Sequence, residues 1–457
     1  MYTHYNINKK YKGRKMYNII LSIIIAIVYI VLLISSKFIY RNIINPVSIF
    51  TSMWLGFSFI SCFGFWDMYI PSYETISFIL IATLAFSITS LVYYASSKKK
   101  CDSKLDFNDN VDTSKLEKKI EQKILIINAL ALLWMSKFIS KMLPIILSGD
   151  WNLARYYYLN ASTVHTVYTT KESLLCQWII YPIFYATTIY SAYLFSIKKI
   201  NYKIMITSLI GVLSIVISTA GRNSLFKLII FYAIAFLFKT NRKISIWKKI
   251  KQMSIGIKVL LVVGVYILVY ISSKRSLSSN ISVFQNVMFY FTGPIVYFDN
   301  IIKNPSFFGL DVDLLWGKAT FGFLTTPIEI IASSLSGGNY AGADNIITSY
   351  VNYYANFSPT IKGNAVSTSL YPFMKDFGYL GILIGPVIFA LIVNYVYTKS
   401  MNLYNDNYVF WNCLSIYMLY IVFFSEWQYD LLFPSSLAIM AVLYMLVAKK
   451  PFKFKIK

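Results

Sequence analysis

The sequence predicts an all-α polytopic membrane protein with about 11–12 transmembrane helices and one large extracytoplasmic loop. Hydrophobic residues make up 57% of the 457 residues, and the mean hydropathy is +0.57. Soluble domains rarely exceed half apolar residues. Many apolar runs approach the roughly 20 residues that cross the hydrocarbon core. One long segment, residues 272–376, interrupts these runs and is neither a span nor a charged domain.

The apolar runs define the expected membrane spans, which together form a single integral membrane domain over residues 1–457. Basic residues precede the first run and no small-residue cleavage site follows it, so we expect Met16–Ser36 to be retained rather than removed as a signal peptide. The spans are expected near 17–36, 47–66, 75–95, 123–147, 173–196, 204–219, 224–238, 253–271, 377–397, 409–425 and 431–448.

The charge distribution predicts the orientation of the spans. The net charge is +24, from 43 basic and 19 acidic residues. The bases crowd into short loops and the tail, which is typical of cytoplasmic segments and of contact with anionic lipids rather than of nucleic-acid binding. The basic loop 96–122 is therefore expected in the cytoplasm and the loop 272–376 outside. An odd span count would put the basic N-terminus outside, against the same rule, so its side is left open.

The long outer loop has the composition of a substrate-handling surface. It is rich in Tyr, Phe, Asn, Ser and Gly. The apolar segment 281–302 predicts an interfacial or half-inserted helix that Pro294 breaks. Further prolines are expected to cut the rest of the loop into short helices. The chain shows no internal repeat, which disfavours transporter folds built from two related halves.

Arginine is scarce in the segments expected outside, and each of these arginines is a candidate ligand for phosphate. Arg155 follows a Gly-Asp turn and precedes three tyrosines, of which Tyr157 is a candidate for stacking on a sugar. The alternative is an aromatic belt with Arg155 reaching lipid phosphate. Arg222 lies in a four-residue turn between two spans, where a charge is costly unless it faces a polar cavity. The alternative is a simple turn.

Other candidate residues lie at the ends of outer segments. Lys274 and Arg275 open the long loop, and either bind substrate or anchor a span end. Asp376 closes the loop, where a carboxylate caps the following helix or acts as a base. Glu426 lies in another outer acidic turn and is a candidate for substrate binding. His165 is the only outer group that titrates near neutrality.

Cofactor motifs are missing from the sequence. The four cysteines have no metal-ligand or disulfide spacing, and two histidines cannot build a histidine metal site. There is no phosphate-binding P-loop and no dinucleotide fingerprint. We therefore predict no metal and no cofactor. An outward-facing enzyme of this kind would use a donor that is already activated in the membrane.

The chain resembles the bacterial oligosaccharide repeat-unit polymerases, the Wzy-type O-antigen or capsule polymerases. The resemblance covers the layout of about a dozen spans with one large outer loop in the C-terminal half. Its local marks are GRNSLFKL at 221–228, FTGPIVYFD at 291–299 and LYPFMKDFGYLG at 370–381.

The resemblance implies a GT-C-like glycosyltransferase in the bacterial cytoplasmic membrane. Its substrates would be undecaprenyl-diphosphate-linked oligosaccharides, and the growing chain would move onto the non-reducing end of a new lipid-linked repeat. Arginines would stabilise the charge that develops on the leaving diphosphate. Family members are thought to need no metal or nucleotide. A chain-length regulator and a flippase are the implied protein partners.

Two other functions are left open by the sequence. A ligase would move a polymer from the same lipid carrier to another acceptor, although residues 272–376 contain no histidine of the kind that ligases carry in this loop. A lipid-linked oligosaccharide flippase would be a transporter, which the missing repeat and the long loop disfavour.

Overall fold

The computed structural model describes residues 2–98, 114–160, 167–238, 283–312, 314–336, 342–363, 367–402 and 405–449. Within these ranges the chain is helical apart from a two-stranded antiparallel ladder, β1 (Ala355–Asn356) with β2 (Lys362–Gly363). It divides into two compact units. The first unit comprises residues 1–99, 280–395 and 421–433. The second comprises residues 100–279, 396–420 and 434–457.

Several helices of the described residues are long and apolar enough to cross a membrane, which confirms an all-α polytopic membrane protein. Five such segments are Ile20–Tyr40, Tyr73–Ser97, Lys118–Leu147, Tyr202–Thr219 and Leu370–Met401. Shorter apolar helices are Pro46–Ser61, Asn223–Leu237, Tyr408–Phe424 and Pro434–Val447. The predicted span 253–271 lies outside the described residues. The prediction of a single membrane domain stays a prediction.

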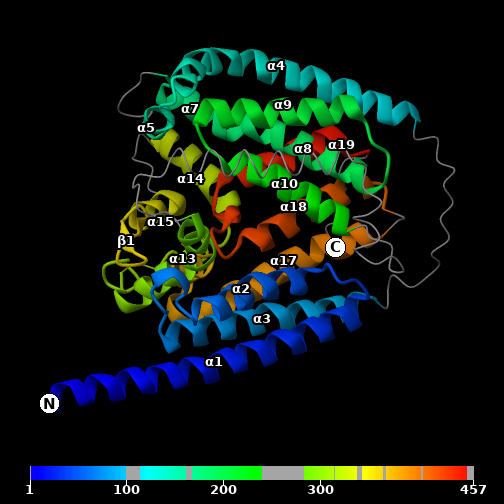
Figure 1. The fold of residues 1–457 in the computed structure, drawn as a ribbon. Coiled ribbons are helices and arrows are strands. Elements are labelled where there is room, and N and C mark those ends of the chain that lie inside the picture. The colour runs from blue at the N-terminus through cyan, green and yellow to red at the C-terminus, as the bar shows by residue number, and fades with distance from the viewer. Residues whose placement is uncertain are drawn as a thin grey trace. The chain divides into compact units, whose positions relative to one another are not determined.

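The first unit is built on three helices, α1 (Tyr2–Tyr40), α2 (Pro46–Ser61) and α3 (Tyr73–Lys98), which pack side by side (Figure 1). Asn45 caps α2 with its side chain. A buried polar node joins this layer to α17 (Gly381–Met401). The Tyr40 hydroxyl lies 3.0 Å from the Ser90 carbonyl and 2.5 Å from Asn394 Oδ1, and Asn394 donates back to Ser90 Oγ at 2.8 Å. Such bonds hold helices together where apolar contact alone gives little preference over lipid.

From residue 280 on, the segment predicted as the outer loop belongs to the first unit, and it forms α13 (Val283–Lys303), α14 (Gly322–Ser336), α15 (Ala343–Val351), the small ladder and α16 (Leu370–Phe377). The helix predicted over 281–302 is confirmed, but the break at Pro294 is wrong because α13 continues through it. Pro294 has no N–H for the Tyr290 carbonyl four residues earlier. The Trp427 indole donates to that carbonyl instead, which satisfies the freed acceptor.

The end of the loop also differs from the prediction. Helix α16 begins at Leu370, so Asp376 lies in the last turn of a helix and does not cap the helix that follows. Its carboxylate accepts from the backbone N–H groups of Ala319 and Thr320 at 3.0 and 2.6 Å, and from the Thr320 hydroxyl. Lys375 donates to the carbonyls of Gly309 and Val312. Loop groups therefore satisfy both side chains with hydrogen bonds, which lets this stretch be buried.

The second unit is a helical bundle that is built around α8 (Tyr181–Ser196). Helices α9 (Tyr202–Thr219), α10 (Asn223–Phe238) and α19 (Pro434–Val447) pack against α8, and α4 (Ser114–Leu147) runs along α9 (Figure 1). Gly211 of α9 permits a close approach to α8, because a Cβ there would lie 2.4 Å from the Phe184 ring.

Polar contacts also join connecting segments within each unit. In the second unit, Glu121 pairs with Lys203 at 3.4 Å and accepts from Asn201. In the first unit, Tyr69 donates its N–H to the Phe357 carbonyl at 2.8 Å. The predicted sides of the membrane stay predictions.

Candidate functional site

A short helix after α4 positions Arg155. Gly149 adopts a left-handed φ of +89°, which turns the chain sharply. Asp150 then caps α5 (Trp151–Leu159) by accepting from the Leu153 N–H at 2.9 Å. The sequence Gly-Asp-Trp-Asn is therefore a helix start, and it places Arg155 one turn into α5.

The Arg155 guanidinium lies against the turn between α9 and α10. Its Nη1 donates to the Thr219 carbonyl at 3.1 Å. A Cβ built on Gly221 would lie 3.3 Å from the same Nη1 and 2.8 Å from Thr219 Oγ1. Since Arg222 is the next residue in this turn, the Arg155 side chain lies against the turn that carries the second arginine that the sequence singled out.

The α9–α10 turn has an unusual backbone that places these groups. Ala220 ends α9 with φ +47° and ψ 32°, a left-handed conformation that a non-glycine residue rarely adopts. Such strain costs about 1–3 kcal/mol and is concentrated at functional sites. The Tyr168 hydroxyl donates to the Ser218 carbonyl at 2.8 Å, and the Gly221 N–H donates to Thr219 Oγ1. These bonds fix the turn from two sides.

Two buried hydrogen-bond donors at and near Arg155 have no acceptor. Its Nε is buried and has no hydrogen-bond partner, and the buried Tyr181 hydroxyl also has none. The guanidinium carbon lies 5.2 Å from the centre of the Tyr158 ring. Within the described part of the chain, Arg155 pairs with no carboxylate. A partly buried guanidinium whose buried Nε is unused fits an oxyanion, which accepts several hydrogen bonds at once.

The electrostatics of the cluster follow from burial. Burial lowers the pKa of the Arg155 guanidinium, and Tyr158 and Tyr181 act in the opposite direction. The guanidinium still carries its charge at neutral pH because its intrinsic pKa is above 12. Burial raises the pKa of the Tyr158 hydroxyl, which therefore stays a neutral donor. The cluster is cationic with neutral phenols around it.

One cation near this turn was missed by the sequence reasoning. Lys227 lies in the first turns of α10, 5.3 Å from the centre of the Tyr185 ring and 5.4 Å from that of Tyr420. A lysine within the apolar run 224–238 is itself a signal, since ionisable residues in membrane helices are costly and usually functional.

The other predicted residues take different places. Tyr157 packs against the apolar core of the second unit. Glu426 is fully buried in the first unit. Asp376 is held by the three bonds from Ala319 and Thr320 described above, and its role as a base stays a prediction. Lys274, Arg275 and His165 lie outside the described residues, so their proposed roles stay predictions.

Comparisons with known proteins supply no further assignment. No protein-family model, no curated protein and no solved structure matches the chain. Among the described residues, no group of three or more His, Cys, Asp or Glu side chains is arranged to hold a metal ion. The function is therefore argued from the site alone.

Proposed function

We propose that this protein is a membrane glycosyltransferase that polymerises undecaprenyl-diphosphate-linked oligosaccharide repeat units at the outer face of the bacterial cytoplasmic membrane. The observation that carries the proposal is the position of the Arg155 guanidinium, with a buried and unpartnered Nε, against the turn that bears Arg222. This cluster lies beside apolar helices, as a site for the diphosphate of a membrane lipid requires. The layout of spans and outer loop also supports the proposal.

The reaction accounts for the cationic cluster. The bond between the sugar's anomeric carbon and the diphosphate oxygen breaks, and the bond electrons pass to the diphosphate. A hydroxyl at the non-reducing end of a second repeat forms the new bond and gives up its proton to a base. Arg155 and Arg222 stabilise the charge that grows on the leaving diphosphate. The N-terminal end of α10, which starts at Asn223, adds a partial positive charge at the same turn.

The reaction also needs a base that takes the proton of the attacking hydroxyl. Asp376 and His165 were the sequence candidates. The carboxylate of Asp376 already accepts three hydrogen bonds, so it serves as a base only if the 319–320 segment releases it. A polymerase needs no metal or nucleotide for this step, because the lipid diphosphate is an activated leaving group.

The test is the polysaccharide made by cells that carry variants as their only copy. Arg155→Ala and Arg222→Ala each remove one donor of charge stabilisation and are expected to lower polymer formation about 10²–10³-fold. Single repeat units should still reach the surface, whereas loss of a flippase would leave none there. Normal polymer in Arg222→Ala cells with normal protein levels would refute the proposal.

A variant that changes no charge tests the geometry. Gly221→Ala places a methyl group 2.8 Å from Thr219 Oγ1 and 3.3 Å from Arg155 Nη1, so the guanidinium must move. We expect polymer to fall at least tenfold, since small misplacements of catalytic groups cost up to about 10² in rate. Gly56→Ala is the matched control, because nothing lies within 4 Å of its new methyl group. That variant should make normal polymer.

A further inference from the structure

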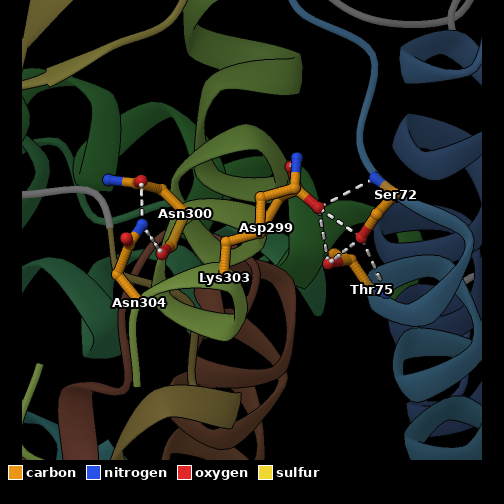
Figure 2. A network of polar contacts seen from close by, with 6 residues as sticks. All are labelled: Ser72, Thr75, Asp299, Asn300, Lys303 and Asn304. Atoms are coloured by element: carbon orange, nitrogen blue, oxygen red, sulfur yellow. Dashed lines mark hydrogen bonds and ion pairs between the residues drawn. The ribbon is translucent and has the colours of Figure 1, made fainter. Parts of the chain in front are cut away.

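Among the described residues the first unit buries four acids, and one of them, Asp430, accepts from the Gln428 amide at 3.1 Å. The other three differ sharply in how their carboxyl groups are satisfied. Asp299 accepts bonds from Ser72, Thr75 and Lys303 (Figure 2). Asp376 accepts from the 319–320 segment. Glu426 is 0% exposed, and neither of its oxygens has a hydrogen-bond partner. Two of these acids are thus explained by the fold, and Glu426 is not.

The surroundings of Glu426 contain further unpartnered polar atoms. The Ser369 N–H donates to the Ser425 carbonyl at 2.8 Å, so the chain at 368–369 lies alongside the chain at 425–426. Thr368 Oγ1 and Ser369 Oγ are buried and also lack partners. Four buried polar side-chain atoms on two adjacent segments therefore lack hydrogen-bond partners.

The cost of this arrangement argues for an occupant. Each buried polar atom without a partner costs about 1–3 kcal/mol, and native structures contain few of them. A fold that keeps four such atoms on two adjacent segments favours a ligand with several donors and acceptors. Burial raises the pKa of the Glu426 carboxyl well above its usual range. The neutral acid both donates and accepts, as a guest with hydroxyl groups requires.

The residues next to Glu426 indicate which kind of ligand fits there. Trp427 and Gln428 follow Glu426 directly and are partly exposed, so the cluster lies close to a surface of the first unit. The Trp427 indole is fixed by its bond to the Tyr290 carbonyl and packs on Phe57, with 5.8 Å between ring centres. A rigid aromatic ring beside uncharged hydroxyl and carboxyl groups suits a sugar, which offers an apolar face and a ring of hydroxyls.

We propose that Glu426, Thr368 and Ser369 form a hydroxyl-binding subsite that takes a sugar residue of the lipid-linked substrate. The sugar class rests on the proposed function, whereas the unpartnered atoms do not. In this subsite the carboxylic acid and two hydroxyls exchange hydrogen bonds with sugar hydroxyls, and no charge is transferred. Glu426 is a binding residue. Its unpartnered carboxyl group lowers the stability of the protein when no sugar is bound.

The test combines stability with polymer formation. Glu426→Met removes both unpartnered oxygens and keeps an apolar side chain of similar length. We expect the purified full-length Glu426→Met variant in detergent to have a melting temperature equal to or higher than that of the unmodified protein. In cells that carry this variant, we expect the amount of polymer to fall at least tenfold. Glu426→Gln keeps a neutral donor and acceptor and should lose less than Glu426→Met. Normal polymer in Glu426→Met would show a site filled by water only and would overturn the proposal.

Two further outcomes keep the test decisive. A drop in melting temperature of Glu426→Met would contradict the claim that its oxygens are unpartnered. If this variant does not accumulate, Thr368→Val decides, because it removes one hydroxyl at constant shape. It should lower polymer at least threefold at normal protein levels, and unchanged polymer would overturn the subsite. The infrared band of a protonated carboxyl group should also disappear in Glu426→Gln, and its absence from the unmodified protein would count against the neutral acid.

The subsite and the proposed function fail in distinguishable ways. Polymer that is lost in Arg155→Ala but kept in Glu426→Met leaves the polymerase standing and removes only the subsite. If polymer is instead kept in Arg155→Ala cells but lost in Glu426→Met cells, the result overturns the diphosphate site at Arg155. The melting temperature and the infrared band do not depend on the enzymatic activity at all.

Discussion

Asp299 fastens the outer helix α13 to the start of α3, and its removal should loosen that junction measurably. Its Oδ1 accepts from the Ser72 N–H at 2.8 Å, the Ser72 hydroxyl at 2.5 Å and the Thr75 hydroxyl at 2.8 Å (Figure 2). Lys303, one turn along α13, pairs with Oδ2. An acid of one helix thus caps the N-terminus of another, where negative charge is favoured.

The magnitude follows from the donors that Asp299→Ala leaves behind. The Lys303 side chain is 55% exposed and its pair contributes little. Thr75 keeps a contact of 3.1 Å with the Ser72 hydroxyl. The Ser72 N–H and one hydroxyl hydrogen lose their acceptor, at about 1–2 kcal/mol each because Ser72 is only partly buried. We therefore expect a loss of about 2–4 kcal/mol in the free energy of opening this junction.

Hydrogen exchange of the Ser72 amide in the full-length protein measures this loss directly. A loss of about 2–4 kcal/mol accelerates exchange by roughly 30- to 10³-fold, since 1.36 kcal/mol is a factor of ten. Asp311→Ala is the control, because this exposed acid bonds only the nearby Ser306 hydroxyl, and it should change the exchange less than threefold. Exchange of the Ser72 amide in Asp299→Ala within threefold of the unmodified protein would refute the reasoning.

Three further predictions concern the second unit. Gly211→Ala places a methyl group 2.4 Å from the Phe184 ring and should cost about 1–3 kcal/mol by overpacking, read as a lower midpoint of unfolding; an unchanged midpoint would show that the helices separate easily. The bonds from Lys137 and from the backbone of Thr169, which caps α7 (Thr170–Leu175), lower the pKa of Glu172 from 4.5 to about 2. The stability that these bonds contribute is therefore present above pH 4.5 and fades as the pH falls toward 2. Since the pair is partly exposed, Glu172→Gln should remove at most about 1 kcal/mol at neutral pH and flatten the acid limb of a stability curve; an unaltered limb would contradict the assignment. Arg155→Lys keeps the charge but not the planar fork of donors. The amount of polymer should therefore fall about tenfold or more, with the melting temperature unchanged. Full activity of this variant would show that charge alone suffices.

Most helices were predictable because their cause is local. An apolar run of about 20 residues specifies a membrane helix by itself, and the starts of α2 and α5 are fixed by Asn45 and Asp150 side chains that cap them. The continuity of α13 was not predictable. It depends on Trp427, which lies far along the chain and supplies the donor that Pro294 lacks.

The candidate site was predictable in its residues but not in its arrangement. Arg155 and Arg222 stand out because arginine is costly at the edge of a membrane. The turn against which Arg155 lies contains the left-handed Ala220, which no residue preference predicts. The burial of Glu426 was also hidden, since its sequence neighbours are polar and aromatic. Lys227 was visible in the sequence as a single charge in an apolar run.

The most direct test of the central claim is polymerisation by the purified full-length protein in liposomes. The donor is the lipid-linked repeat unit extracted from cells that lack this protein. We predict a ladder of multimers together with free undecaprenyl diphosphate, and neither product from the Arg155→Ala, Arg222→Ala double variant at equal reconstitution. Intact repeat units that only change leaflet, or a double variant that makes the same ladder, would contradict the account.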